Sequence, residues 1–210
     1  MPDYKSSAPK RHGALSEGKQ LPEQARNHGY FLEEHPFNGK LSLRGKSSDK
    51  AFLKAAANVL GADLPTTPGS TAVTSSELIL WQRPDAWLIV CADGAQFELL
   101  EKLNKDLSGI HHLVTNLTDN YTTLRLSGEA DLRDILKSGC YFDLHPEAFP
   151  AGAYAQSTLA EVDVLIHAVP TSGQGGEIFD IYLRRSFAAY VWAWLEKACL
   201  LAAKDKALEA

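Results

Sequence analysis

The chain has 210 residues, of which 45% are hydrophobic and 22% charged, and its formal net charge is −5. This composition is typical of a soluble globular chain, and the length suffices for one medium domain or two small lobes. It excludes the dense Lys/Arg face of a nucleic-acid-binding protein, and no run of about 18 apolar residues could cross a membrane.

Residues 1–36 have the composition of an extended N-terminal tail. They are rich in Lys, Ser, Gly, Pro and Asn and almost free of periodic apolar residues. The one apolar cluster, Tyr30-Phe31-Leu32, could dock on a neighbouring protein or on the body of the same chain. We expect a single body over residues 37–210, with a division into two lobes, 37–118 and 119–210, as an alternative. Because no signal peptide precedes the tail, we expect a cytoplasmic location.

The body begins with a strand and a helix. Residues 40–44 alternate polar and apolar side chains, which predicts a half-buried strand. Ser48 or Asp49 can cap a helix that ends at Gly61. Residues 61–75 are rich in Pro, Thr, Gly and Ser and predict a loop.

Two apolar runs, 78–81 and 87–91, flank Arg83-Pro84-Asp85. Proline fixes the turn and aspartate bonds its own backbone, so the pattern predicts a hairpin. Both runs are apolar on both faces, which predicts burial on both sides of the sheet. Leucines at helical spacing then predict a helix from about residue 95 to residue 107.

The second half repeats this order of elements. Residues 112–117 and 121–126 flank Thr118-Asp119-Asn120, which predicts another hairpin. Ser127 can cap a short helix over residues 129–137.

Alternation over 162–168 and 179–183, joined by a glycine-rich turn at 172–176, predicts a further strand pair. A helix starts at Ser186. Its apolar face is expected to contain Phe187, Tyr190, Val191, Trp194, Leu195 and Ala198. The elements together predict an α+β fold, a mostly antiparallel sheet with packed helices.

The sequence carries no strong catalytic signature, since GxSxG, the P-loop and HExxH are all missing. Gly173–Gly176 lies between two strands, so it favours a hairpin tip over a phosphate loop. His111 and His112 are adjacent in a strand and point to opposite faces, so they cannot chelate one ion. The three cysteines are odd in number and far apart, which predicts neither a disulfide framework nor a zinc site.

Three other groups each allow two interpretations. Asp143 could orient His145 as a base, but a turn made rigid by Pro146 is favoured. The run Arg184-Arg185-Ser186 could clamp an anion, but a helix N-cap beside an ion pair is favoured. Trp192, on the flank of the last helix, is either an exposed interface anchor or packs under the tail, whereas Trp194 is expected in the core.

The segment from Gly139 to Gly152, GCYFDLHPEAFPAG, resembles a motif of the gamma subunit of heterotetrameric sarcosine oxidase. The resemblance continues through Gln156–Ala160 and Arg185–Ala188, and it covers roughly residues 37–200. Arg83–Leu88 is similar to the family's Gly-Pro-Asp-Glu-Trp-Leu turn, with Arg83 and Ala86 as differences. The candidate motif and interface residues are Gly139, Asp143, Leu144, Pro146, Phe149, Pro150, Gly152, Arg185, Ser186, Phe187 and Trp192.

The resemblance implies a fold similar to aminomethyltransferase, the glycine cleavage T protein. It also implies partners, the alpha, beta and delta subunits of an enzyme that demethylates sarcosine oxidatively to glycine. Tetrahydrofolate and O2 are the acceptors there, and methylenetetrahydrofolate (or formaldehyde) and H2O2 are the products. FAD, FMN, NAD, tetrahydrofolate and zinc are implied in the other subunits, with no catalytic residue, cofactor or metal in this chain.

We therefore expect a structural subunit whose residues 139–152 and 184–192 lie near each other and near a subunit contact. One alternative is a folate-binding one-carbon transfer protein that acts alone, for which Asp143 and Asp180 are the candidate pterin carboxylates. Another is an assembly factor for the flavin subunits.

Overall fold

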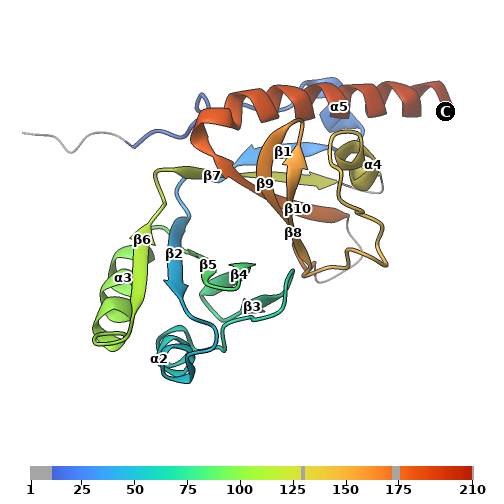
Figure 1. Cartoon of the computed structure of the whole chain (residues 1–210). Helices are drawn as coiled ribbons and strands as arrows, with labels where there is room; N and C mark the ends of the chain where they lie inside the picture. Colours follow the sequence, from blue (N-terminus) through green and yellow to red (C-terminus); the bar gives the residue numbers. More distant parts are fainter. Residues whose placement is uncertain (1–10, 129–130, 172–175, 210) are drawn as a thin grey trace, which may run out of the picture.

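The computed structural model describes residues 11–128, 131–171 and 176–209 and contains two five-stranded sheets flanked by helices (Figure 1). The strands are β1 (Phe31–Glu34), β2 (Gly39–Gly45), β3 (Thr71–Val73), β4 (Glu77–Arg83), β5 (Ala86–Cys91), β6 (His112–Asn116), β7 (Tyr121–Gly128), β8 (Tyr154–Leu159), β9 (Val162–Ala168) and β10 (Glu177–Arg184). The helices are α1 (Glu23–Asn27), α2 (Lys50–Leu60), α3 (Ala95–Asp106), α4 (Leu132–Lys137) and α5 (Ala188–Glu209), with a 3-10 turn η1 (Arg185–Phe187) before α5.

Each sheet forms a lobe with its own helices. The first lobe combines the sheet β3-β4-β5-β2-β6 with α2 and α3, and the second combines the sheet β1-β7-β10-β9-β8 with α1, α4 and α5. Every strand pair in both sheets is antiparallel. The α+β class expected from the sequence is therefore confirmed.

In the first lobe, the helix and the hairpin predicted from capping and turn residues both form. The Asp49 carboxylate accepts hydrogen bonds from the N–H groups of Ala51 and Phe52 and caps α2. The helix ends at Gly61, whose φ of 72° suits glycine. The hairpin β4–β5 forms, and every residue of β5 is buried, whereas β4 is buried only at its centre. The predicted loop 61–75 differs in one respect, because it contains the short edge strand β3.

The hairpin predicted over residues 112–126 is wrong. β6 pairs with β2 in the first sheet, while β7 pairs with β1 and β10 in the second. The N–H of Leu117 still donates to the Lys40 carbonyl at 2.8 Å, and Thr118 Oγ1 then accepts from the Lys40 N–H at 3.0 Å. Residues 117–120 therefore connect the two lobes, because β6 pairs with β2 in one sheet and β7 pairs with β1 and β10 in the other.

The chain before residue 37 also differs from an extended tail, in the part that the structure describes. It forms α1 and the edge strand β1, which pairs with β7 in register Leu32↔Leu126. Four of its apolar side chains are buried in the core of the second lobe: Leu21, Ala25, Tyr30 and Leu32. Apolar residues this sparse show no periodicity in the sequence, and tertiary pairing orders them.

The helix predicted over residues 129–137 is shorter than expected. Ser127 lies inside β7, and α4 begins after Asp131, which adopts a φ of 85°. Residues 129 and 130 lie outside the described part. The strand pair β9–β10 forms as predicted, with Ile166 opposite Ile181, but positions 172–175 of its glycine-rich turn are likewise not described.

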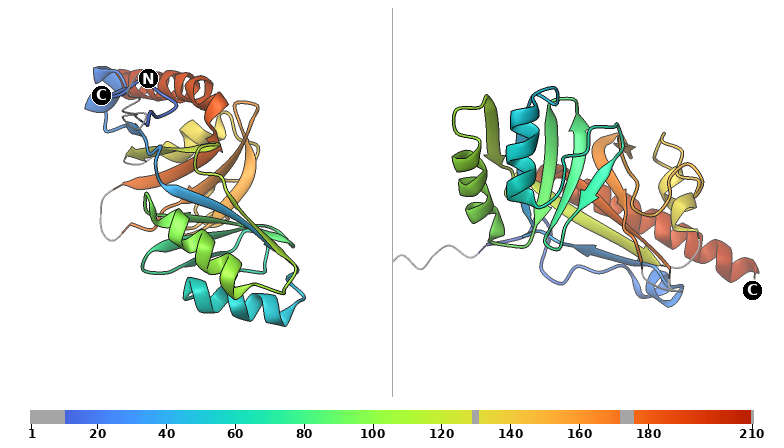
Figure 2. Two further views of the ribbon diagram at one scale, coloured as in Figure 1. Left: turned by 90° about the vertical axis from the view of Figure 1, so that its left-hand side faces the viewer. Right: turned by 90° about the horizontal axis from the view of Figure 1, so that it is seen from below.

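The two sheets pack face to face, with helices on the outside (Figures 1 and 2). α1, α4 and α5 cover the outer face of the second sheet, and α2 and α3 cover that of the first. The contact between the sheets is small and mixed in polarity. Its buried members are Leu80, Leu88, Val90, Tyr154, Leu165 and Tyr182.

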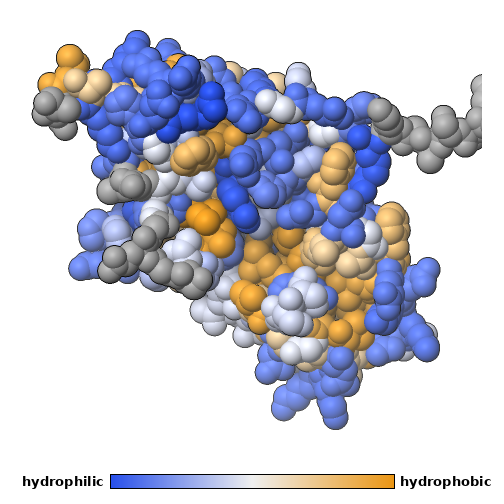
Figure 3. Space-filling view, turned by 180° about the vertical axis from the view of Figure 1, so that it is seen from behind, coloured by the Kyte–Doolittle hydropathy of each residue, from blue (hydrophilic) through white to orange (hydrophobic). Residues whose placement is uncertain are grey.

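Viewed from behind, the first lobe carries a broad apolar area, whereas the side of α5 is mostly hydrophilic (Figure 3). Among the described residues, none of the helices has the length and apolar character that crossing a membrane requires.

Candidate functional site

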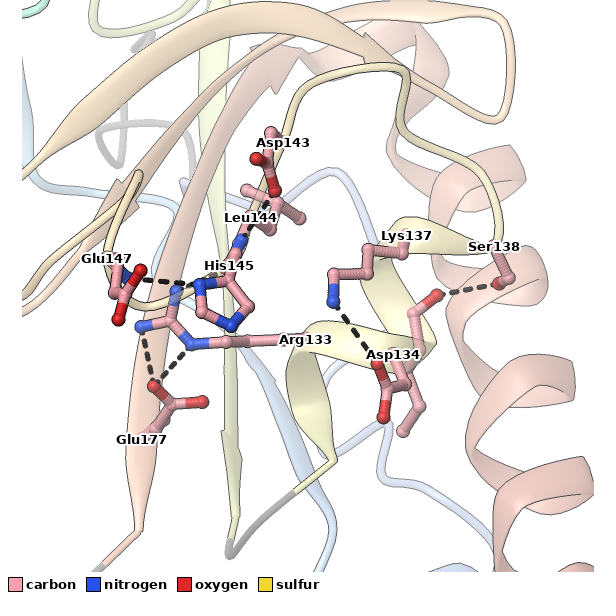
Figure 4. Close-up of polar contacts among 10 residues, drawn as sticks. Arg133, Asp134, Lys137, Ser138, Asp143, Leu144, His145, Glu147 and Glu177 are labelled. Atoms are coloured by element: carbon pink, nitrogen blue, oxygen red, sulfur yellow. Dashed lines mark hydrogen bonds and ion pairs between the residues drawn. The ribbon is translucent and has the colours of Figure 1, made fainter.

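The motif from Gly139 to Gly152 follows α4 as a loop fixed by its own backbone (Figure 4). Asp143 Oδ1 accepts the His145 N–H at 2.9 Å, and the His145 carbonyl accepts the N–H groups of Ala148 and Phe149 at 2.9 and 2.7 Å. This is the turn that Pro146 favours. Asp143 bonds backbone and does not orient the His145 ring, so the interpretation as an acid–base pair finds no support here.

The loop is anchored at both sides by apolar residues and a glycine. Leu144 and Phe149 are fully buried in the core of the second lobe. Gly152 has a φ of 86°, and its N–H donates to the Ala168 carbonyl at 2.7 Å. Pro146 and Pro150 are exposed.

Arg133 of α4 fixes the loop by hydrogen bonds to its backbone, and the sequence analysis did not identify this residue. Its Nη1 donates to the carbonyls of Leu144 and Phe149 at 2.5 and 2.9 Å, and its Nε donates to Glu177 Oε1 at 2.6 Å. The guanidinium is nearly buried and lies over the Phe179 ring. The one available signal was its position among the apolar residues of a short helix.

The junction of β10 and α5 differs from the predicted N-cap. The backbone turns through η1 first, and Ser186 makes no capping hydrogen bond among the described residues. Within the described ranges, Arg185 forms no ion pair with a buried carboxylate. Its guanidinium donates to the carbonyls of His12 and Gly13 at 2.8 and 3.1 Å. Phe187 is exposed.

The two tryptophans of α5 differ in outcome: Trp192 takes the second of its two predicted environments, and Trp194 is less buried than expected. Trp192 is fully buried, donates to Glu196 Oε2 at 3.0 Å and lies beneath Lys19, so it packs under the N-terminal segment. Trp194 is only partly buried. The sheet meets the side of α5 that carries Val191 and Leu195, and this rotation turns Trp192 inward and Tyr190 outward.

The motif loop and α5 meet at one point. A Cβ atom on Gly139 would fall inside van der Waals distance of the Trp194 ring. Tyr141 of the loop and Tyr190 of α5 line the same hollow of about 290 Å³. The expected proximity of residues 139–152 and 184–192 thus holds at this end of the loop, whereas Arg185 contacts the N-terminal segment.

A buried polar row crosses the inner face of the second sheet. Arg125 donates two hydrogen bonds to Asp180, at 2.7 and 2.8 Å, and His167 lies opposite Asp180 on β9. Burial lowers the pKa of His167, and neither ring nitrogen has a partner among the described residues. Burial also lowers the pKa of the nearby Lys40 to about 8. Of the two carboxylates considered for a pterin, Asp180 is engaged by Arg125 and Asp143 is exposed on its turn.

The histidines and cysteines considered as metal ligands have other surroundings in the described part of the chain. His112 contacts the Ile110 carbonyl and Asn104, while His111 is exposed. Within the described ranges, His, Cys, Asp and Glu form no group of three suited to an ion. The three cysteines are free and buried.

The model of the sarcosine oxidase, gamma subunit family matches residues 44–200. The chain belongs to this family. A sarcosine oxidase subunit gamma from Corynebacterium sp. (strain P-1) is 31% identical over 165 residues, which cover 78% of this chain and 77% of that protein. One from an Arthrobacter species is 34% identical over 138 residues, 64% of this chain and 65% of that protein.

Solved structures agree with the family. A chain of the heterotetrameric sarcosine oxidase from Corynebacterium sp. U-96 superposes with a TM-score of 0.73 at 26% identity, covering 86% of this chain and 87% of the other. The glycine cleavage system aminomethyltransferase T from Bartonella henselae gives a TM-score of 0.61 at 13% identity, over 82% of this chain and 47% of that one. The second match shows the fold alone, which is the fold that the resemblance implied.

Proposed function

We propose that this chain is the gamma subunit of a heterotetrameric sarcosine oxidase, in which it assembles with alpha, beta and delta subunits and supplies no catalytic group. The observation that carries the proposal is the match of nearly the whole chain to a chain of a solved heterotetrameric sarcosine oxidase.

 The polar contacts of the motif loop support it further, because the side chains of Asp143 and Arg133 bind the backbone of the loop.

The chemistry of the complex would then lie in the other subunits. The enzyme would demethylate sarcosine oxidatively to glycine, pass the one-carbon unit to tetrahydrofolate and reduce O2 to H2O2. FAD, FMN, NAD, tetrahydrofolate and zinc would be held by the alpha, beta and delta subunits. This chain would stabilise their arrangement through its surface, and we place the whole assembly in the cytoplasm.

Co-expression with alpha, beta and delta subunits tests the proposal. We expect a stable complex with one copy of each chain, sarcosine-dependent H2O2 formation by that complex, and no turnover by the isolated chain. Omission of this chain should lower the yield of assembled complex. The proposal fails if the isolated chain oxidises sarcosine, or if it never co-purifies with the other subunits.

A folate-binding protein that acts alone is the second candidate, favoured by the fold shared with an aminomethyltransferase. Against it, the buried carboxylate of Asp180 already receives two hydrogen bonds from Arg125. Calorimetric titration of the isolated chain with tetrahydrofolate separates the candidates, since only the second predicts saturable binding. An assembly factor, the third candidate, would be absent from the mature complex.

A further inference from the structure

An apolar stripe runs along the outer side of α5, away from the sheet. Tyr190 and Leu201 are 54% and 52% exposed, and they lie eleven residues, or about three helical turns, apart on one face. Trp194 lies between them and is partly buried. The opposite side of the helix carries the buried Leu195 and Cys199. A helix that is apolar on both sides is covered on both sides in a stable assembly.

The stripe borders a groove between α4 and α5. One hollow of about 480 Å³ and the smaller hollow of about 290 Å³ share Ser138 and Trp194, so they form one continuous depression. Figure 4 shows Ser138 at the end of α4, beside the ribbon of α5. We call this depression the α4–α5 groove. Its non-charged lining includes Ser138, Gly139, Tyr141, Tyr190, Trp194 and Leu201.

The charges along the α4–α5 groove are mostly acidic. Four carboxylates line it, Asp131, Asp134, Asp205 and Glu161, against the two amines of Lys137 and Lys197. Asp134 and Lys137 form an exposed pair at 3.5 Å, which is weak. The groove therefore favours an occupant with positive charge next to apolar side chains.

We infer that the α4–α5 groove receives an apolar, basic helical segment of another subunit of the complex. The inference rests on the proposed function. From Tyr190 to Asp205 the groove follows fifteen residues of α5, or about 22 Å, which matches a helix of about four turns. Exposed aromatic side chains, among them Tyr141 at 83% exposure, provide the anchors that such an interface needs.

Two other occupants fit less well. The described N-terminal segment already lies on the other side of α5, where Lys19 covers Trp192 and α1 packs. A second copy of this chain would bring the acidic groove against an identical one, and like charges would repel.

The test compares assembly of single variants with the co-expressed alpha, beta and delta subunits. Leu201→Asp and Tyr190→Asp add a carboxylate to the groove at exposed positions that folding does not require. Phe97→Asp is the matched control, because Phe97 is 63% exposed on α3 in the first lobe. We expect the two groove variants to lower the co-purified fraction by about tenfold or more, and Phe97→Asp to change it by less than about twofold.

A charge reversal tests the chemistry of the occupant. Asp205→Lys should weaken assembly at low salt, and the effect should shrink as the ionic strength rises. Circular dichroism of each isolated variant checks that the chain is folded. Wild-type assembly of both groove variants, or an equal loss in Phe97→Asp, overturns the inference while the proposed function stands. If the wild-type chain binds none of the other subunits, the proposed function fails first. If it instead forms a homodimer that Leu201→Asp dissociates, the occupant is a second copy and the inference is wrong.

Discussion

Arg125 and Asp180 face each other across β7 and β10, and the guanidinium donates to both carboxylate oxygens. The carboxylate of Asp180 is almost fully buried, and the side chain of Arg125 is one-third exposed. Hydrogen bonding to Asp180 raises the pKa of Arg125, so the guanidinium stays charged. This bidentate hydrogen bonding fixes the relative orientation of β7 and β10 at the junction between the lobes.

The pair yields the first prediction. Arg125→Met leaves the carboxylate of Asp180 buried without its partner, which should lower the free energy of unfolding by about 3 kcal/mol. Lys102→Met breaks the exposed pair with Glu98 on α3 and should leave the free energy of unfolding nearly unchanged, because water screens this pair. Urea denaturation of both variants measures the difference. Equal losses would contradict a structural role for the buried pair.

The second prediction concerns pH and His167. Burial lowers the pKa of this imidazole in the folded state, so the unfolded chain takes up the proton more readily. Stability attributable to His167 is therefore present above the unfolded pKa of about 6.5 and lost as the pH falls below it. Between pH 7.5 and 5.5, wild type should lose about 1 kcal/mol more than His167→Gln. The groups that face the ring are Asp180, Arg125 and Tyr154, and all three remain in the variant.

The third prediction uses the contact between Gly139 and Trp194. Gly139→Ala places a methyl group against the indole and should destabilise the chain by about 1–3 kcal/mol. In a Trp194→Ala background the same change should cost much less, because the obstructing ring is gone. A double-mutant cycle by urea denaturation measures this coupling, and additive effects would show that the ring moves aside freely.

The fourth prediction concerns Arg133 as the support of the motif loop. Arg133→Met leaves the carbonyls of Leu144 and Phe149 without their donor and should cost about 2–4 kcal/mol. Hydrogen exchange should accelerate at the Phe149 amide, which belongs to the loop. Arg185→Met is the matched control, since the side chain of Arg185 donates to the carbonyls of His12 and Gly13, outside the motif loop. Its effect should be confined to the N-terminal segment.

Signals that act within a few residues predicted the structure best. The cap Asp49, the stop at Gly61, the turn at Pro84 and the turn at Asp143 each depend on neighbours in the chain, and each formed.

Contacts between residues far apart in the chain could not be predicted from the sequence. Nothing local distinguishes a hairpin from a crossover at residues 117–120, because both need the same turn residues. The predicted apolar face of α5 was partly wrong: Val191 and Leu195 are buried as expected, but Trp192 is buried instead of Tyr190, because the helix is apolar nearly all round. Arg133 finds its acceptors eleven and sixteen residues away, beyond any pattern of spacing.

The pairing of β1 with β7 carries a consequence for how the chain is made. The first lobe uses one uninterrupted stretch, so it can fold on the ribosome while the rest is still being translated. The second lobe needs β1, which precedes the first lobe in the chain, and α5, which follows it, so its core closes only after α5 has been made. Until then β1 lies next to the folded first lobe with its apolar side chains exposed to solvent. In this state the nascent chain is most open to association with a chaperone or with another nascent subunit.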